Sequence, residues 1–205
     1  MVGLAPLAKL AFDAATGGLG ANPIAEGMNR LGFWTLTLLA LSLVPTPAKD
    51  FLGLSWPIRI RRTIGLLAFA CGALHFSWYL VLDKFFDAGD IGADLVKRPF
   101  ITVGFAALVL LAPLAVTSTD GWVRRLGHPR WKALHRVVYA AAALGVVHFL
   151  WRVKADKLKP SLFAAAVGTL LALRVVAYGR RRLREGASRS LAALERSGTG
   201  GAARQ

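Results

Sequence analysis

Apolar residues fall in five long blocks along the chain, separated by short polar stretches. The blocks cover residues 31–44, 64–82, 99–116, 131–151 and 161–178. Each approaches the length of about 20 residues with which a helix crosses a hydrocarbon core of about 30 Å. The first block is the shortest, and we expect it to borrow residues 27–30. The pattern predicts an all-α, polytopic membrane helix bundle with five to six transmembrane helices.

The N-terminal segment leaves the sixth helix open. Residues 1–12 are apolar but too short to span a bilayer, and Gly17, Gly18 and Gly20 interrupt the pattern. We expect residues 1–22 to form a partial first helix or an interfacial segment, and residues 23–179 to form the transmembrane domain. Residues 180–205 are expected to be a basic tail that lies on the inner leaflet or is disordered.

Composition excludes several other classes of protein. Hydrophobic residues make up 55% of the chain, and 26 Lys and Arg against 11 Asp and Glu give a formal net charge of +15. The basic residues stand between the apolar blocks, where they set membrane topology, so we do not expect nucleic-acid binding. The single cysteine, Cys71, excludes an intrachain disulfide, a cluster held by several thiolates and a CxxCH haem attachment.

The basic residues also predict an orientation, because cytoplasmic loops carry an excess of Lys and Arg. One set of loops, together with the tail from Arg180 onward, holds the larger number and should face the cytoplasm. The opposite loops hold fewer, and four aspartates dilute them within residues 83–94. We therefore expect the C-terminus in the cytoplasm.

Two histidines, His75 and His148, lie deep in apolar blocks and at matching depth in the outer half of the predicted membrane. Ionisable side chains at this depth are candidates for function. Two neutral imidazoles from facing helices suit the iron of a b haem held between helices. Gly72 and Gly145 each stand one turn before a histidine, where a flat ring is able to approach the backbone.

His135 is a third candidate ligand. It precedes His148 by 13 residues, which is about 20 Å along a helix, and the two side chains do not face one groove unless the helix is locally distorted. We leave His135 for a second haem or for the neighbourhood of a flavin, while His128 is expected to be solvated in a loop. Basic residues near the cytoplasmic face suggest an anion site for a flavin mononucleotide (FMN) phosphate or a quinone-proximal cofactor. Its members are Arg61, Arg62, Arg124, Arg125 and Lys132.

Several segments together resemble a known family. They are residues 61–66 leading to Leu74-His75, residues 97–102 with 117–119, residues 130–139 with the sequence RWKALHRVVY, residues 147–151, and residues 17–23 after the N-terminal segment. They are similar to MsrQ, the haem-binding membrane subunit of the periplasmic methionine sulfoxide reductase system, within the ferric reductase-like transmembrane superfamily. The likeness extends from about residue 17 to residue 180.

The resemblance implies a non-catalytic electron-transfer subunit in the bacterial inner membrane. Such a subunit takes electrons from the quinone pool or a cytoplasmic flavin reductase and passes them through FMN and b haem. The acceptor is a periplasmic molybdopterin enzyme, MsrP, which reduces methionine sulfoxide in oxidised proteins. His75, His135 and His148 match the histidine positions of the family, and the number of haems, one or two, stays open.

Two other readings remain. A different quinol-linked cytochrome b or ferric reductase-like subunit would share the haem but would not share the signature of residues 131–151. A transporter or scaffold without haem would have broken helices with polar residues near the membrane centre, and there the sequence offers only the histidines.

Overall fold

The computed structural model of the chain describes the backbone of residues 5–202 and, beyond residue 180, only some of the side chains. All regular elements in this part are helical. They follow one another as α1 (Ala5–Ala15), α2 (Pro23–Leu43), α3 (Pro45–Leu52), α4 (Pro57–Trp78), the π-helix η2 (Tyr79–Asp83), α5 (Ala88–Lys97), α6 (Pro99–Val116), α7 (Asp120–Leu126), α8 (His128–Leu134), the 3₁₀-helix η3 (His135–Val137), α9 (Val138–Arg152) and α10 (Leu158–Ala202).

Five helical segments are long and apolar enough to cross a membrane, which confirms the predicted all-α polytopic architecture. They cover Pro23–Leu52, Pro57–Asp83, Pro99–Val116, His128–Arg152 and Leu158–Arg180. The first span begins at Pro23, earlier than the apolar block 31–44 from which it was predicted. It begins there because the Asn22 side chain accepts a hydrogen bond from the amide of Ala25 at 3.0 Å and Pro23 fits the first turn.

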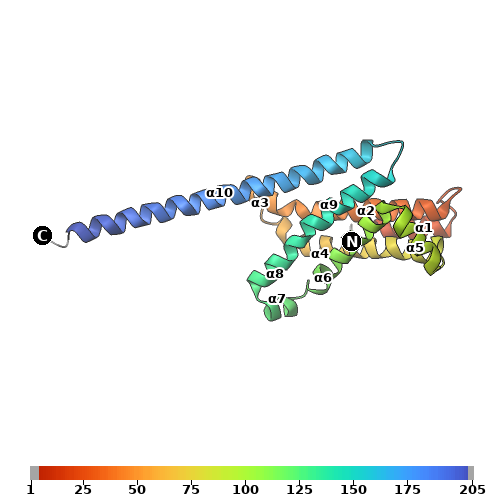
Figure 1. Ribbon diagram of the computed structural model, residues 1–205, viewed down its shortest axis with the longest axis horizontal. Coiled ribbons are helices and arrows are strands. Elements are labelled where there is room, and N and C mark those ends of the chain that lie inside the picture. Colours follow the sequence, from red (N-terminus) through yellow and green to blue (C-terminus); the bar gives the residue numbers. More distant parts are fainter. Residues whose placement is uncertain (1–4, 203–205) are drawn as a thin grey trace.

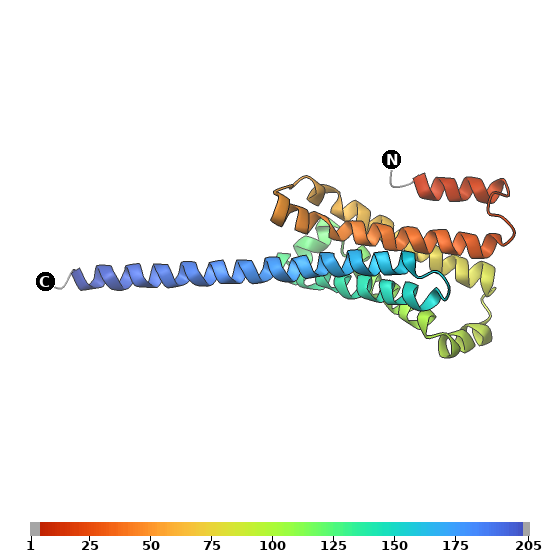
Figure 2. The same cartoon turned by 90° about the horizontal axis from the view of Figure 1, so that it is seen from above.

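The spans pack as two close pairs, α2 with α4 and α6 with α9, and α10 lies against α9, α3 and α2. Figure 1 shows these helices running side by side along the long axis of the bundle. The short helix α1 runs alongside α2 in Figure 2 and packs Leu10 against Leu31. The shared core of the spans includes Leu43, Ala68, Ala141 and Ala142, small or fully buried residues that let the helices approach closely.

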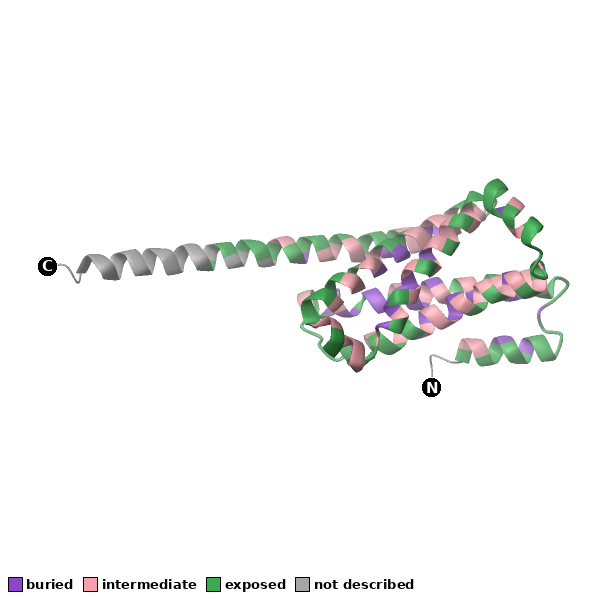
Figure 3. Ribbon diagram, turned by 60° about the horizontal axis from the view of Figure 1, so that its bottom comes forward, coloured by how far each residue is buried: buried purple, intermediate pink, exposed green. Residues whose placement is uncertain are grey.

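Apolar side chains also cover much of the outside of the spans, where Figure 3 shows exposed and half-buried residues along every helix. Val109, Leu162 and Val175 expose 50%, 59% and 72% of their surface. In water these residues would form a large apolar patch, whereas in a bilayer they face lipid chains. The exposure pattern therefore agrees with a membrane protein.

The two ends of the bundle differ in their charged side chains. At one end, called here the histidine end, lie η2, α5 and the turn between α9 and α10, and at the other, the basic end, lie α3, α7 and α8. At the histidine end Lys84 forms an ion pair with Asp94 at 2.9 Å, and this bond holds the pKa of Asp94 below its ordinary value. Asp13 of α1 pairs with Lys9 and with Arg30 of α2, which ties α1 to the bundle.

The last helix continues well past its apolar part. The span Leu158–Arg180 is followed by further helix to Ala202, which Figures 1 and 2 show projecting beyond the basic end. The sequence suggested a tail that is disordered or lies on the membrane, whereas the structure continues the helix to Ala202. The helix is able to propagate because the residues after Arg180 are largely good helix formers and include no proline. Residues 203–205 lie outside the described part of the chain, as do residues 1–4 of the N-terminal segment.

Candidate functional site

The centre of the candidate site is the pair His75 and His148. His75 comes from α4 and His148 from α9, and their imidazole centroids lie 6.2 Å apart with the ring planes at 82°. Both side chains line one cavity that α2, α4, α6 and α9 enclose. The structure therefore brings together the two histidines that the sequence placed at matching depth.

A backbone carbonyl holds each imidazole by the same nitrogen. Nδ1 of His75 lies 2.9 Å from the carbonyl oxygen of Met28, and Nδ1 of His148 lies 2.7 Å from that of Phe100. Because a carbonyl oxygen only accepts hydrogen bonds, each Nδ1 must carry the proton and donate. In a neutral imidazole Nε2 then keeps its lone pair, which is the arrangement of a metal-binding histidine with a carbonyl as its outer partner.

Two glycines make room for the imidazole rings. A Cβ atom at Gly32 of α2 would lie 3.1 Å from Cε1 of His75, and a Cβ at Gly104 of α6 would lie 2.5 Å from Nδ1 of His148. The sequence singled out Gly72 and Gly145 instead, and both line the cavity. Gly32 and Gly104 were missed because they lie on other helices than the histidines, and only the packing order brings them to the rings.

The donor set fits haem iron. His75 and His148 line the same cavity with their ring centroids 6.2 Å apart, and each keeps the lone pair of Nε2, so the two imidazoles are suited to bind one haem iron. In the described part of the chain no three His, Cys, Asp or Glu side chains gather into a metal cluster, but haem iron requires only two protein ligands because the porphyrin supplies four.

The cavity is lined mainly by apolar side chains and small residues, which suits a porphyrin. It encloses about 90 Å³, so the macrocycle would need flexible lining side chains such as Leu36 and Leu108 to change rotamer. Its charged and amide side chains lie at the histidine end, where Arg152 and Asn29 join the two imidazoles.

His135 lies apart from this pair and has partners of its own. It begins the 3₁₀-helix η3 between α8 and α9, so the helix is locally distorted at this point, but His135 does not line the cavity of His75 and His148. Thr117 donates its hydroxyl hydrogen to the carbonyl of Pro113 at 2.6 Å, so its oxygen is left to accept from Nε2 of His135 at 3.1 Å. The Trp131 ring stacks on the imidazole with centroids 4.0 Å apart. These contacts explain the place of His135 without a metal.

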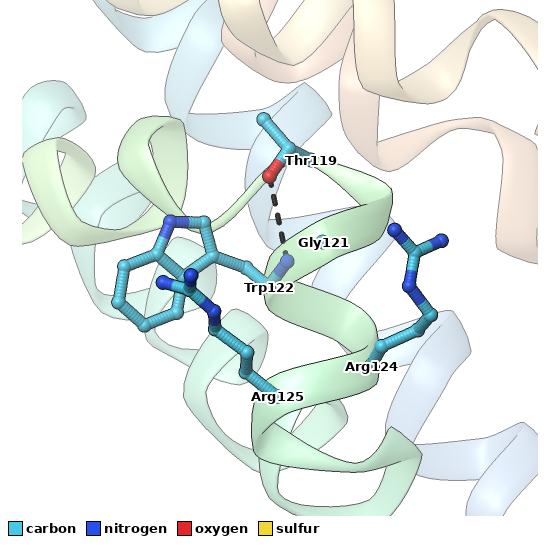
Figure 4. A pocket seen from close by; sticks show the side chains of 5 residues that line it. All are labelled: Thr119, Gly121, Trp122, Arg124 and Arg125. Atoms are coloured by element: carbon cyan, nitrogen blue, oxygen red, sulfur yellow. Dashed lines mark hydrogen bonds between the residues drawn. The ribbon is translucent and has the colours of Figure 1, made fainter.

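The basic residues at the other end have different partners and do not form one cluster. Arg62 forms an ion pair with Asp120 at 2.8 Å, which ties α4 to the start of α7. Arg124 and Arg125 of α7 line an open pocket with Thr119, Gly121 and Trp122. Figure 4 shows their guanidinium groups on opposite sides of α7, with that of Arg125 over the Trp122 indole. Lys132 and His128 are both exposed on α8, and His128 begins that helix instead of lying in a loop.

Arg61 points into the bundle and joins a residue that the sequence reading missed. Arg174 of α10 donates hydrogen bonds to the hydroxyl of Tyr139 and, at 2.6 Å, to the carbonyl of Leu43. Arg61 lies beside the same tyrosine. The Leu43 carbonyl needs this donor, because the residue four positions later is Pro47, which has no N–H. Arg174 therefore donates to the carbonyl that Pro47 leaves without a partner at the junction of α2 and α3. The sequence signal for this role was a single arginine within the last apolar block, which was overlooked.

Replacing Arg174 by methionine is expected to destabilise the protein by about 1–3 kcal/mol, because the buried Leu43 carbonyl loses its donor. The thermal unfolding midpoint in detergent should fall by several degrees. Arg182→Met is the matched control, since Arg182 is exposed and, among the described side chains, bonds the Tyr178 hydroxyl one turn away. Equal midpoints for the two variants would contradict the role given to Arg174.

Comparisons with known proteins agree on one family. Residues 31–146 match the family described as "Ferric reductase like transmembrane component". The chain is 54% identical over 179 residues to a protein of Rhodospirillum rubrum, covering 87% of this chain and 86% of that protein. It is 46% identical to one of Herminiimonas arsenicoxydans (90% and 85% covered) and 49% identical to one of Deinococcus radiodurans (82% and 83% covered). All three are named protein-methionine-sulfoxide reductase heme-binding subunit MsrQ.

Proposed function

This chain belongs to the MsrQ family of haem-binding subunits within the ferric reductase-like transmembrane proteins, and from that premise we propose that it carries electrons across the bacterial inner membrane to a periplasmic molybdopterin enzyme, MsrP. MsrP would reduce methionine sulfoxide in oxidised proteins, so the chain itself would hold no catalytic site for that reaction.

The observation that carries the proposal is the pair of imidazoles that line one cavity, each held through its Nδ1 atom by a backbone carbonyl. A b haem bound there would supply one-electron chemistry at iron. His75 and His148 would hold it through Nε2, and the carbonyls of Met28 and Phe100 would fix the ring orientation and raise the basicity of each nitrogen. Held by two imidazoles, the haem would be suited to electron transfer and not to oxygen chemistry.

The charge distribution supports an orientation for this transfer. The basic end, which carries Arg62, Arg124, Arg125 and the part of α10 beyond Arg180, would face the cytoplasm. The histidine pair would then lie toward the periplasm, near the acceptor. Electrons would enter at the basic end from the quinone pool or from a cytoplasmic flavin reductase, with FMN as an intermediate carrier.

The decisive experiment combines a spectrum with a transfer assay. Detergent-purified protein should show the dithionite-reduced minus oxidised spectrum of a low-spin b haem, with haem and flavin quantified on the same sample. The reduced protein should then be reoxidised when purified MsrP and a methionine sulfoxide substrate are added. A haem protein that is not reoxidised would point to a different quinol-linked cytochrome b, and a protein without haem would reject the proposal.

His135→Ala is expected to keep the haem content and the low-spin spectrum, because the contacts of His135 are with Thr117 and Trp131 and not with the cavity. Reduction from the cytoplasmic side should become slower, since the substitution loosens the joint of α8 and α9 at the basic end. Pyridine haemochrome analysis and stopped-flow reduction test this. Loss of about half the haem would instead make His135 the ligand of a second haem.

The FMN site is proposed at the basic end, on the pocket beside α7. Arg124→Ala and Arg125→Ala, singly and together, are expected to lower the flavin bound per haem several-fold, because each removes a guanidinium able to bind phosphate. Arg61→Ala should leave flavin content unchanged, since Arg61 is turned toward Tyr139. Unchanged flavin in the double variant would show that these arginines only set topology.

A further inference from the structure

Arg152 stands at the mouth of the cavity that holds the histidine pair. It is the last residue of α9, it is half-buried, and its side chain lines the cavity together with His75 and His148. Its guanidinium donates a hydrogen bond to the side-chain oxygen of Asn29, which reaches across from α2. The charge is close enough to act on both imidazoles.

The partners of Arg152 differ from those of neighbouring cations. At the histidine end Arg30 pairs with Glu26 and Asp13, and Lys84 and Arg98 both pair with Asp94. Arg152 instead contacts a neutral amide, and none of the ion pairs between described residues includes it. A guanidinium carries five N–H donors in a planar fork, and a half-buried cation is costly without a counter-charge. Arg152 therefore lacks an anion on the side that faces the cavity.

We propose that Arg152 and Asn29 form a carboxylate-binding subsite at the mouth of the cavity, and that its occupant is a propionate of the haem. The subsite depends on the proposed function in one respect, because it requires a haem between His75 and His148. A planar guanidinium matches a carboxylate in a bidentate arrangement, and the Asn29 amide group offers a further N–H donor. The ion pair would anchor the macrocycle by its edge, independently of the two axial bonds, and would fix which edge faces the periplasmic surface.

The rate at which the protein loses its haem tests the subsite when two porphyrins are compared. Wild type, Arg152→Gln and Arg152→Lys are loaded either with haem b or with haem b dimethyl ester, in which both carboxylates are blocked. Release to excess apomyoglobin is then followed by absorbance. Arg152→Gln should release haem b about tenfold to a hundredfold faster than wild type, as expected for the loss of a charge-assisted hydrogen-bonded pair. Arg152→Lys should lie between them, and all three should release the dimethyl ester at one rate.

Lys154→Gln is the matched control, because it removes an exposed positive charge two residues further along the chain and outside the cavity lining; its release rates should equal those of wild type. If Arg152→Gln fails to accumulate, Asn29→Asp replaces it, since an aspartate would occupy Arg152 and repel the propionate. That variant should speed the release of haem b and leave the release of the ester unchanged.

Two results would overturn the subsite. If Arg152→Gln releases both porphyrins faster than wild type by the same factor, Arg152 acts on packing or binds the carboxylate of another amphiphile. If it releases neither porphyrin faster, Arg152 does not hold the haem. Failure of the proposed function looks different, because wild type would then either show no low-spin haem spectrum or keep its haem reduced when MsrP and methionine sulfoxide are added.

Discussion

His148→Ala is expected to abolish low-spin haem in the purified protein, and His75→Ala to do the same, because on the proposed function each imidazole would supply one of the two protein bonds to the iron. Haem per chain should fall by about tenfold or more, given that losing only an outer partner of a metal-bound histidine already costs about tenfold to a hundredfold in metal affinity. The measurement is pyridine haemochrome per chain, with the reduced spectrum reporting spin state.

Chemical rescue separates ligation from misfolding in these variants. Each substitution to alanine leaves a space the size of an imidazole on one side of the cavity, so free imidazole at millimolar concentration should restore part of the low-spin spectrum. The exposed His128 provides the control, since His128→Ala should keep full haem content. Full haem content in His148→Ala would remove that histidine from the ligand set.

The meeting of His75 and His148 in one cavity could be predicted from the sequence because its signal is local. An imidazole deep in an apolar block is rare enough to stand out, and counting residues from the ends of two blocks gives equal depth for His75 and His148. The spans themselves were found for the same reason, since their length and composition are properties of contiguous residues. The first span was placed too late only because polar residues such as Glu26 and Arg30 hide its first turns, where the Asn22 cap begins the helix.

The features that the sequence did not give depend on which helices become neighbours. Arg174 was not singled out from the sequence, because its partner becomes clear only when α10 lies beside the junction of α2 and α3, where the proline at position 47 leaves a carbonyl without a donor. Arg61 and Arg62, adjacent in sequence, seemed to serve one anion site, but a helix turns about 100° per residue and directs them to different partners. The 3₁₀ segment at His135 was likewise beyond reach, because no proline or glycine marks it.

Gly104→Ala is expected to weaken haem binding by about tenfold or more through His148, with no loss of helix stability. A Cβ atom at this position would lie 2.5 Å from Nδ1 and 2.9 Å from Cε1 of His148, so the ring must move and its bond to the Phe100 carbonyl is lost. Losing such an outer partner lowers metal affinity about tenfold to a hundredfold. Alanine is a better helix former than glycine by about 1 kcal/mol, so α6 itself should not weaken.

Gly65→Ala is the matched control for this variant, because both glycines lie inside membrane-spanning helices and a Cβ at Gly65 would meet nothing within 4 Å. Haem per chain and the thermal midpoint of the haem-free protein should be measured for both. We expect low haem with an unchanged or higher midpoint for Gly104→Ala, and wild-type haem for Gly65→Ala. Equal haem content in the two variants would mean that the space at Gly104 is not needed to orient His148 for binding iron. The ligand assignment of His75 and His148 would then rest on the spacing of their rings alone.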